Sequence, residues 1–108
     1  MIIEITRDNF EQIVLKSVKP VLLFYYGFFD GYKYKLIQIM ENISEQYDDK
    51  AIVGSICFPL QYDFDHLLLK NEIKILPTTI TLSNGKIVAK SVGVLLEKEY
   101  TQILDKLI

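Results

Sequence analysis

Apolar and polar residues follow two alternating periods along the chain, and each change of period marks the end of a predicted element. Segments rich in β-branched and aromatic residues predict strands, whereas apolar residues that recur every three or four positions predict helices. Strands are predicted at residues 2–5, 21–26, 51–58, 78–83 and 86–92. Helices are predicted from apolar stripes at Phe10, Ile13 and Val14; at Leu36, Ile39, Met40, Ile43 and Tyr47; at Phe64, Leu67 and Leu68; and at Tyr100, Ile103, Leu104 and Leu107.

Three local signals refine this prediction. Residues 21–26 are all apolar or aromatic, which is typical of a central strand covered on both faces. Asn84-Gly85 between two strand segments predicts a tight hairpin, because a type I′ turn needs positive φ at both central residues. Thr6 is the expected cap of the first helix, with Asp8 in its first turn. The order β-α-β-α-β-α-β-β-α predicts one α/β domain over residues 1–108, with a single sheet between helices.

Composition narrows the function classes. Half of the 108 residues are apolar, and 12 Lys and Arg against 14 Asp and Glu give a net charge of −2. That balance argues against a nucleic-acid binder, which would carry a basic excess. We find no secretory signal and no apolar run long enough for a membrane span, so a cytoplasmic protein with no membrane partner is expected. Cys57 is the single cysteine, which excludes an internal disulfide and a Cys-x-x-Cys site.

The element order, together with five short motifs between Ile2 and Leu107, resembles the thioredoxin family. The motifs are Ile2-Ile3-x-Ile5-Thr6-x-x-x-Phe10, Ile43-Ser44-Glu45-Gln46-Tyr47, Ile75-Leu76-Pro77-Thr78, Ser83-Asn84-Gly85-Lys86 and Val92-Gly93. The resemblance implies a thioredoxin-like α/β fold, with a central mixed sheet of four to five strands, helices on both faces, and a C-terminal β-hairpin followed by a helix. It also implies a cis peptide bond before Pro77.

The chain departs from the family at the active-site motif. Thioredoxin carries Trp-Cys-Gly-Pro-Cys-Lys there, and the matching residues here are Phe29-Asp30-Gly31-Tyr32-Lys33-Tyr34. Thiol–disulfide exchange needs an attacking thiolate and a resolving thiol, so neither Asp30 nor Lys33 can perform it. The buried aspartate that carries protons in the family corresponds to Phe24. We therefore expect no catalytic residues and no cofactor.

Asp30 has a structural interpretation instead. At the start of the long helix its carboxylate suits the N-cap position, where it would accept the Lys33 backbone N–H and contribute about 1 kcal/mol. The i, i+3 spacing of Asp30 and Lys33 also favours a cap or a surface pair over a catalytic acid–base pair. Replacing Asp30 by alanine should then lower stability.

The resemblance implies that peptide recognition survives without the chemistry. In the family, the residue before the cis-proline pairs its backbone with an extended substrate strand. Leu76 would therefore offer its N–H and C=O to a peptide by β-augmentation. Phe29, Tyr32, Pro77 and Gly93 complete the hypothetical groove. The expected partner is a peptide, another protein or a second copy of this chain.

Aromatic crowding supports a contact surface and also has a simpler explanation. Seven of the 13 aromatic residues lie within 11 positions: Phe24, Tyr25, Tyr26, Phe28, Phe29, Tyr32 and Tyr34. By alternation Phe24 and Tyr26 share one strand face, whereas Tyr32 and Tyr34 are expected at the surface. Exposed tyrosines are typical of interfaces, including a structural homodimer. The same rings could equally fill the space of the lost Cys-Gly-Pro-Cys turn.

Cys57 and the acidic residues around His66 are two further candidate sites. Cys57 lies in a predicted strand, where a free thiol most often packs as a small hydrophobe; the alternative is a redox role as a monothiol or with a partner's cysteines. His66 with Asp63, Asp65 and Glu72 matches no metal-ligand spacing, so a solvated helix face and no metal are expected.

Overall fold

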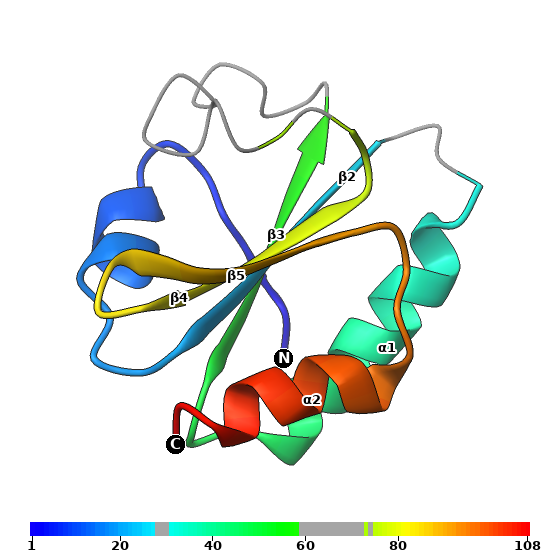
Figure 1. Cartoon of the computed structure of the whole chain (residues 1–108). Helices are drawn as coiled ribbons and strands as arrows, with labels where there is room; N and C mark the ends of the chain where they lie inside the picture. The colour runs from blue at the N-terminus through cyan, green and yellow to red at the C-terminus, as the bar shows by residue number, and fades with distance from the viewer. Residues whose placement is uncertain (28–30, 59–72, 74) are drawn as a thin grey trace.

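A computed structural model of the chain describes residues 1–27, 31–58, 73 and 75–108 (Figure 1). Within these residues the elements follow one another as β1 (Ile3–Glu4), η1 (Glu11–Leu15), β2 (Val21–Gly27), α1 (Lys33–Gln46), β3 (Ile52–Phe58), β4 (Thr78–Ser83), β5 (Lys86–Val92) and α2 (Glu97–Asp105). All five predicted strands are present. The helix predicted around Phe64 lies outside the described residues. None of the described helices is long and apolar enough to cross a membrane.

The strands form one mixed sheet in the order β1-β3-β2-β4-β5. β3 runs parallel to both β1 and β2, whereas β4 is antiparallel to β2 and to β5. This confirms the predicted mixed five-strand sheet and its antiparallel C-terminal pair. β2 and β3 are the central strands, and their carboxyl ends lie at the same edge of the sheet, near the start of α1 (Figure 1).

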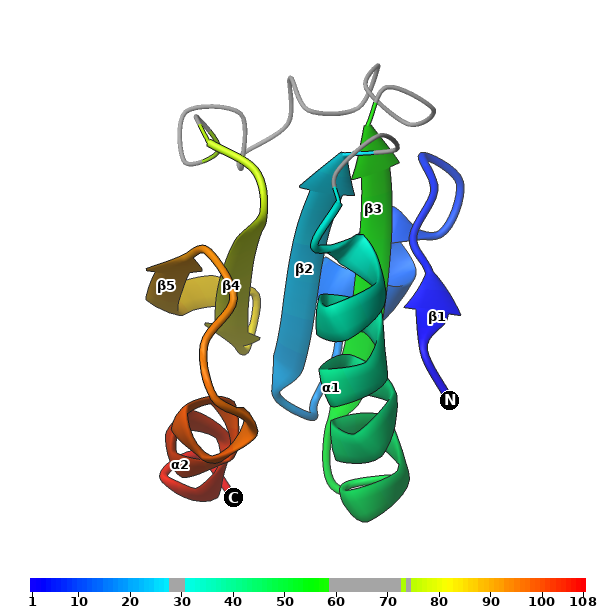
Figure 2. The same cartoon turned by 90° about the vertical axis from the view of Figure 1, so that its right-hand side faces the viewer.

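Helices cover the two faces of the sheet separately. α1 and α2 lie together on one face, and η1 lies on the other (Figure 2). The core under η1 contains Ile5, Phe10, Val14, Val21, Leu23, Tyr25, Ile56, Ile80 and Leu82. The core under α1 and α2 contains Leu22, Phe24, Leu36, Met40, Ile43, Ala51, Val53, Tyr100 and Leu104. Side chains of β2 thus alternate between the two cores, as expected for a strand buried on both faces.

The predicted β-hairpin is confirmed in its backbone geometry. Asn84 has φ 54° and Gly85 has φ 78°, the two positive values that a type I′ turn requires. Gly85 is also held by packing, because a Cβ there would lie 2.7 Å from the Leu15 carbonyl oxygen. The turn and the end of η1 are therefore in direct contact.

The first helix differs from the prediction in type and in capping. It is a π-helical turn, in which the Lys16 N–H donates to the Glu11 carbonyl at 2.9 Å, five residues back. The prediction that the Thr6 side chain caps the helix is not met. Instead, the Asn9 side chain reaches back to Thr6, and its Oδ1 accepts the Thr6 backbone N–H at 2.7 Å. Phe10 and Val14 are buried as predicted.

The long helix begins later than predicted. α1 starts at Lys33, with Tyr32 as its N-cap and no side-chain hydrogen bond at the cap, whereas the prediction started it at Asp30. Asp30 lies outside the described residues, so its predicted capping role stays a prediction. The apolar stripe is confirmed, since Leu36, Met40 and Ile43 are all buried.

Two side-chain hydrogen bonds join α1 and the following residue to α2. Asn42 donates to the Glu97 carboxylate at 3.1 Å, and the Tyr47 hydroxyl donates to the Asp105 Oδ1 at 2.6 Å. The bond to Asp105 raises the pKa of Tyr47 above its usual 10.0, with burial as the second cause. A raised folded-state pKa means that this stabilisation is present below pH 10 and is lost as the pH rises through the folded-state value.

Candidate functional site

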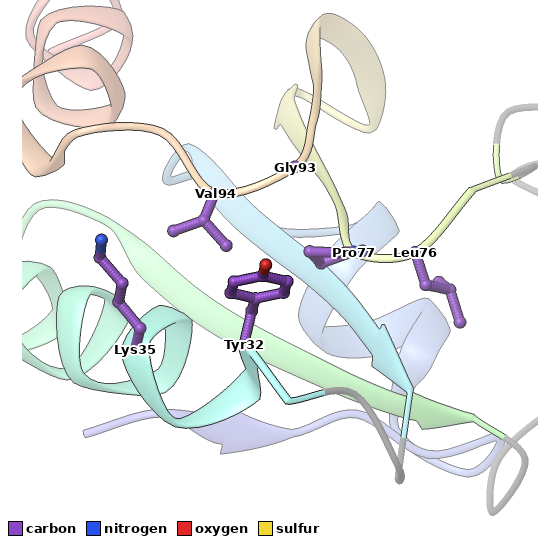
Figure 3. A pocket seen from close by; sticks show the side chains of 6 residues that line it. All are labelled: Tyr32, Lys35, Leu76, Pro77, Gly93 and Val94. Atoms are coloured by element: carbon purple, nitrogen blue, oxygen red, sulfur yellow. The ribbon is translucent and has the colours of Figure 1, made fainter.

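A groove of about 480 Å³ lies between the start of α1 and the two loops that flank β4 and β5. The described residues that line it are Tyr32, Lys35, Leu76, Pro77, Gly93 and Val94 (Figure 3). The helix contributes the first two, the approach to β4 the next two, and the segment after β5 the last two. Its volume is within the range of sites that hold small ligands.

Leu76 and Pro77 form one wall of the groove, immediately before β4 begins at Thr78. The peptide bond between these residues is cis. Gly93 donates its N–H to the Pro77 carbonyl at 2.8 Å, which ties the two loops together. Among the hydrogen bonds of the described residues, none uses the N–H or C=O of Leu76. An extended chain lying against Leu76 would find both groups available.

Gly93 lies in the opposite wall of the groove and leaves space there. Its φ is +85°, a backbone conformation that glycine adopts without steric cost, and a Cβ built there would meet nothing within 4 Å. The position therefore faces open space. The Tyr100 hydroxyl accepts the Leu95 N–H at 3.0 Å and donates to the Gly93 carbonyl at 3.5 Å.

Tyr32 forms the floor of the groove. Its ring lies between Val94 and Pro77 in the close view, and 69% of the residue's surface is exposed (Figure 3). Its carbonyl accepts the Leu36 N–H at 3.1 Å, which anchors the residue to the first turn of α1. Tyr34 is 73% exposed, and the Lys33 Nζ lies 5.1 Å from the centre of its ring. Both tyrosines are at the surface, as predicted.

Behind the groove, the ends of β2 and β3 are apolar. Phe24 is completely buried and stacks on Tyr26, with ring centroids 5.7 Å apart. Burial raises the pKa of Tyr26 to about 12, and a hydrogen bond with the Cys57 side chain adds to the shift. Cys57 itself is 7% exposed and free of disulfides. Its thiol is thus part of the core rather than of the groove.

The structure brings together four of the five residues predicted for the groove: Tyr32, Leu76, Pro77 and Gly93. The fifth, Phe29, lies outside the described residues. So do Asp30, which the resemblance places in the active-site motif, and the metal-ligand candidates Asp63, Asp65, His66 and Glu72. Gly31 of the same motif is exposed and Lys33 is half-buried. In the part of the chain that the structure describes, no cluster of His, Cys, Asp and Glu could hold a metal ion.

Sequence reasoning missed Lys35 and Val94. Lys35 follows Tyr32 by three positions, a spacing that places two residues on the same face of a helix. Val94 follows Gly93 directly. Both could have been found by extending the groove one helical turn and one residue from the positions already chosen.

Comparison with known proteins identifies the family. No protein-family model matches the chain. Thioredoxin from Acidithiobacillus ferridurans is 31% identical over 110 residues, which cover 96% of this chain and 94% of that protein. The chain belongs to the thioredoxin family. Thioredoxin from Buchnera aphidicola is 30% identical over 97% of this chain and 94% of its own length. Chloroplastic thioredoxin Y1 from Arabidopsis thaliana is 30% identical over 93% of this chain and 56% of its own length.

Family membership sharpens the contrast at the motif. This thioredoxin-family chain holds one cysteine in its 108 residues, and that cysteine is in β3. The two positions that the resemblance assigns to the reactive pair are Asp30 and Lys33. The groove beside Pro77 is nevertheless open, with Tyr32 on its floor.

Proposed function

We propose that this chain is a redox-inactive member of the thioredoxin family that binds an extended segment of a partner protein in the groove beside Pro77. The observation that carries the proposal is the combination of an open groove with the N–H and C=O of Leu76, to which no other described residue is hydrogen-bonded. Those groups can pair with one residue of an extended peptide by β-augmentation. The ring of Tyr32 and the side chain of Val94 supply apolar contact for the neighbouring side chain.

The absence of a cysteine pair supports binding without turnover. Disulfide reduction by a single chain requires two thiols within reach of each other, and this chain has only Cys57. A two-cysteine relative releases its partner once it has reduced the partner's disulfide. This chain cannot carry out that step, so its partner would bind and dissociate unchanged. The affinity would then come from backbone pairing and from the apolar contact on Tyr32.

The test of the proposal is a selection of random nine-residue peptides displayed on phage, followed by titration of the chain with selected peptides. We expect Tyr32→Ala to weaken their binding by about fivefold or more, since a buried aromatic contact is worth about 1 kcal/mol. In NMR spectra of the labelled protein, the peptides should shift the amide signals of Leu76 and Gly93.

Tyr34→Ala is the matched control, because Tyr34 is equally exposed but does not line the groove. It should change the affinity less than twofold. Sedimentation of both variants establishes whether a second copy of the chain occupies the groove. Peptides that bind both variants equally, or shift signals elsewhere, would contradict the proposal.

A second function, thiol–disulfide exchange through Cys57 or together with a partner's cysteines, is favoured by the names of the relatives. We expect no such activity. With dithiothreitol as reductant, the chain should not accelerate insulin reduction above the background rate. The Cys57→Ser variant should behave as wild type. The burial of Cys57 is the physical reason. Turnover that disappears in Cys57→Ser would establish the enzyme and overturn redox inactivity.

A further inference from the structure

Of the six described residues that line the groove, Lys35 alone is charged. In the close view its side chain lies at the opposite end of the groove from Leu76, with Tyr32 and Val94 between them (Figure 3). The groove therefore has a backbone-pairing end, an apolar middle and a cationic end.

Lys35 has no counter-charge within the described structure. The Lys35 side chain makes no hydrogen bond or ion pair with another described residue. Lys33, two positions earlier, differs because its ammonium lies over the Tyr34 ring, and it is not among the residues that line the groove. An unpaired ammonium beside apolar walls is available to a carboxylate from outside.

The position of Lys35 in α1 is unfavourable for the helix itself. The first turns of a helix carry a partial positive charge and favour acidic residues. α1 has no acidic residue in its first turn, and both Lys33 and Lys35 lie near its start. α2 shows the favourable arrangement, with Glu97 and Glu99 in its first turn. At the start of α1, the helix dipole and Lys35 both contribute positive charge on the side of the groove.

We infer that the groove selects extended partner segments in which an acidic residue lies two positions from an apolar residue, so that both side chains face the groove, and that Lys35 binds the acidic side chain. This inference rests on the proposed function, since it assigns the specificity of the same groove. The apolar residue would contact Tyr32 and Val94, and the backbone on its other side would pair with Leu76. The carboxylate would then reach the Lys35 end.

The experiment compares peptide selections on wild type and on Lys35→Glu. On wild type, Asp or Glu should be enriched two positions from the apolar residue of peptides that require Tyr32. On Lys35→Glu, Lys or Arg should be enriched at the same place. For a synthetic selected peptide, changing Glu to Gln should weaken binding to wild type about two- to fivefold at low salt, and the difference should shrink at high salt.

Lys16→Glu is the charge-matched control, because Lys16 is exposed at the end of η1 on the other face of the sheet. It should leave the acidic preference unchanged. Lys35→Glu should fold at least as stably as wild type in urea denaturation, since it improves the match with the helix dipole. A loss of acidic preference therefore cannot come from unfolding.

The possible failures are distinguishable. Peptides that require Tyr32 but show no acidic preference would overturn the role of Lys35 and leave the binding function intact. An acidic preference that persists in Lys35→Glu, or disappears equally in Lys16→Glu, would also overturn it. A selection that enriches no peptide dependent on Tyr32 would overturn both the specificity and the proposed function.

Discussion

Replacing Phe24 by aspartate is expected to lower the free energy of unfolding by about 4 kcal/mol or more at pH 7. Phe24 has no exposed surface and lies in the core under α1 with Leu36 and Met40. The substitution removes a buried ring, which alone costs about 3–5 kcal/mol. It also places a carboxylate where the surrounding side chains are apolar. Urea denaturation at pH 7 measures the loss.

The pH dependence of this variant separates the two costs. Burial disfavours the charged form, so the pKa of the new carboxyl group should be raised in the folded state. The folded state then binds more protons than the unfolded state, and stability falls as the pH rises from the unfolded-state pKa through the folded-state value. The variant should therefore recover part of its stability between pH 7 and pH 4.5, relative to wild type at each pH.

Phe24→Leu is the control for volume, because it leaves an apolar side chain. It should cost less than the aspartate variant, and its cost should not vary with pH. An aspartate variant within about 1 kcal/mol of wild type at pH 7 would mean that water or a polar group reaches this position. The site would then retain the environment of the family's proton carrier, which would argue against redox inactivity.

Much of the fold could be predicted because local and long-range preferences agree. The all-apolar run in β2 is buried on both faces, and Asn84-Gly85 adopts the turn that its residue types favour. The type of the first helix could not be predicted. Its π-helical turn depends on a bond from Lys16 to Glu11 and on the approach of Gly85 to the Leu15 carbonyl, and no pattern of apolar residues encodes these contacts.

The groove was accessible from sequence only through the family resemblance. Tyr32, Leu76 and Gly93 are far apart in the chain, and no spacing rule places them together. The order β2-β4-β5 and the position of α1 bring them to one end of the sheet. Lys35 was missed because a lysine in a helix is ordinarily a solvated surface residue, and only its place at the end of the groove beyond Tyr32 and Val94 suggests the binding role proposed for it.

Removal of the Tyr100 side chain is the second change with a large expected effect. Tyr100 is completely buried between α2 and the sheet, in the same core as Phe24. Tyr100→Ala should lower the free energy of unfolding by about 3–5 kcal/mol. Thermal or urea denaturation measures this loss. A cost below about 1 kcal/mol would contradict the packing described here.

Tyr100→Phe isolates the hydroxyl group and connects stability with binding. The hydroxyl accepts the Leu95 N–H and approaches the Gly93 carbonyl, so it holds the wall of the groove from behind. Its loss leaves a backbone N–H without its partner, which should cost about 1 kcal/mol. Because Gly93 and Val94 form that wall, we also expect weaker binding of the selected peptides.

Tyr47→Phe provides the comparison that decides between a local and a global effect. It removes one hydroxyl bond between the end of α1 and α2, to Asp105, away from the residues that line the groove. If the Gly93 segment is positioned by Tyr100, Tyr100→Phe should reduce peptide affinity while Tyr47→Phe does not. Equal affinities in both variants would show that the wall keeps its shape without the hydroxyl, and that groove and core are energetically independent.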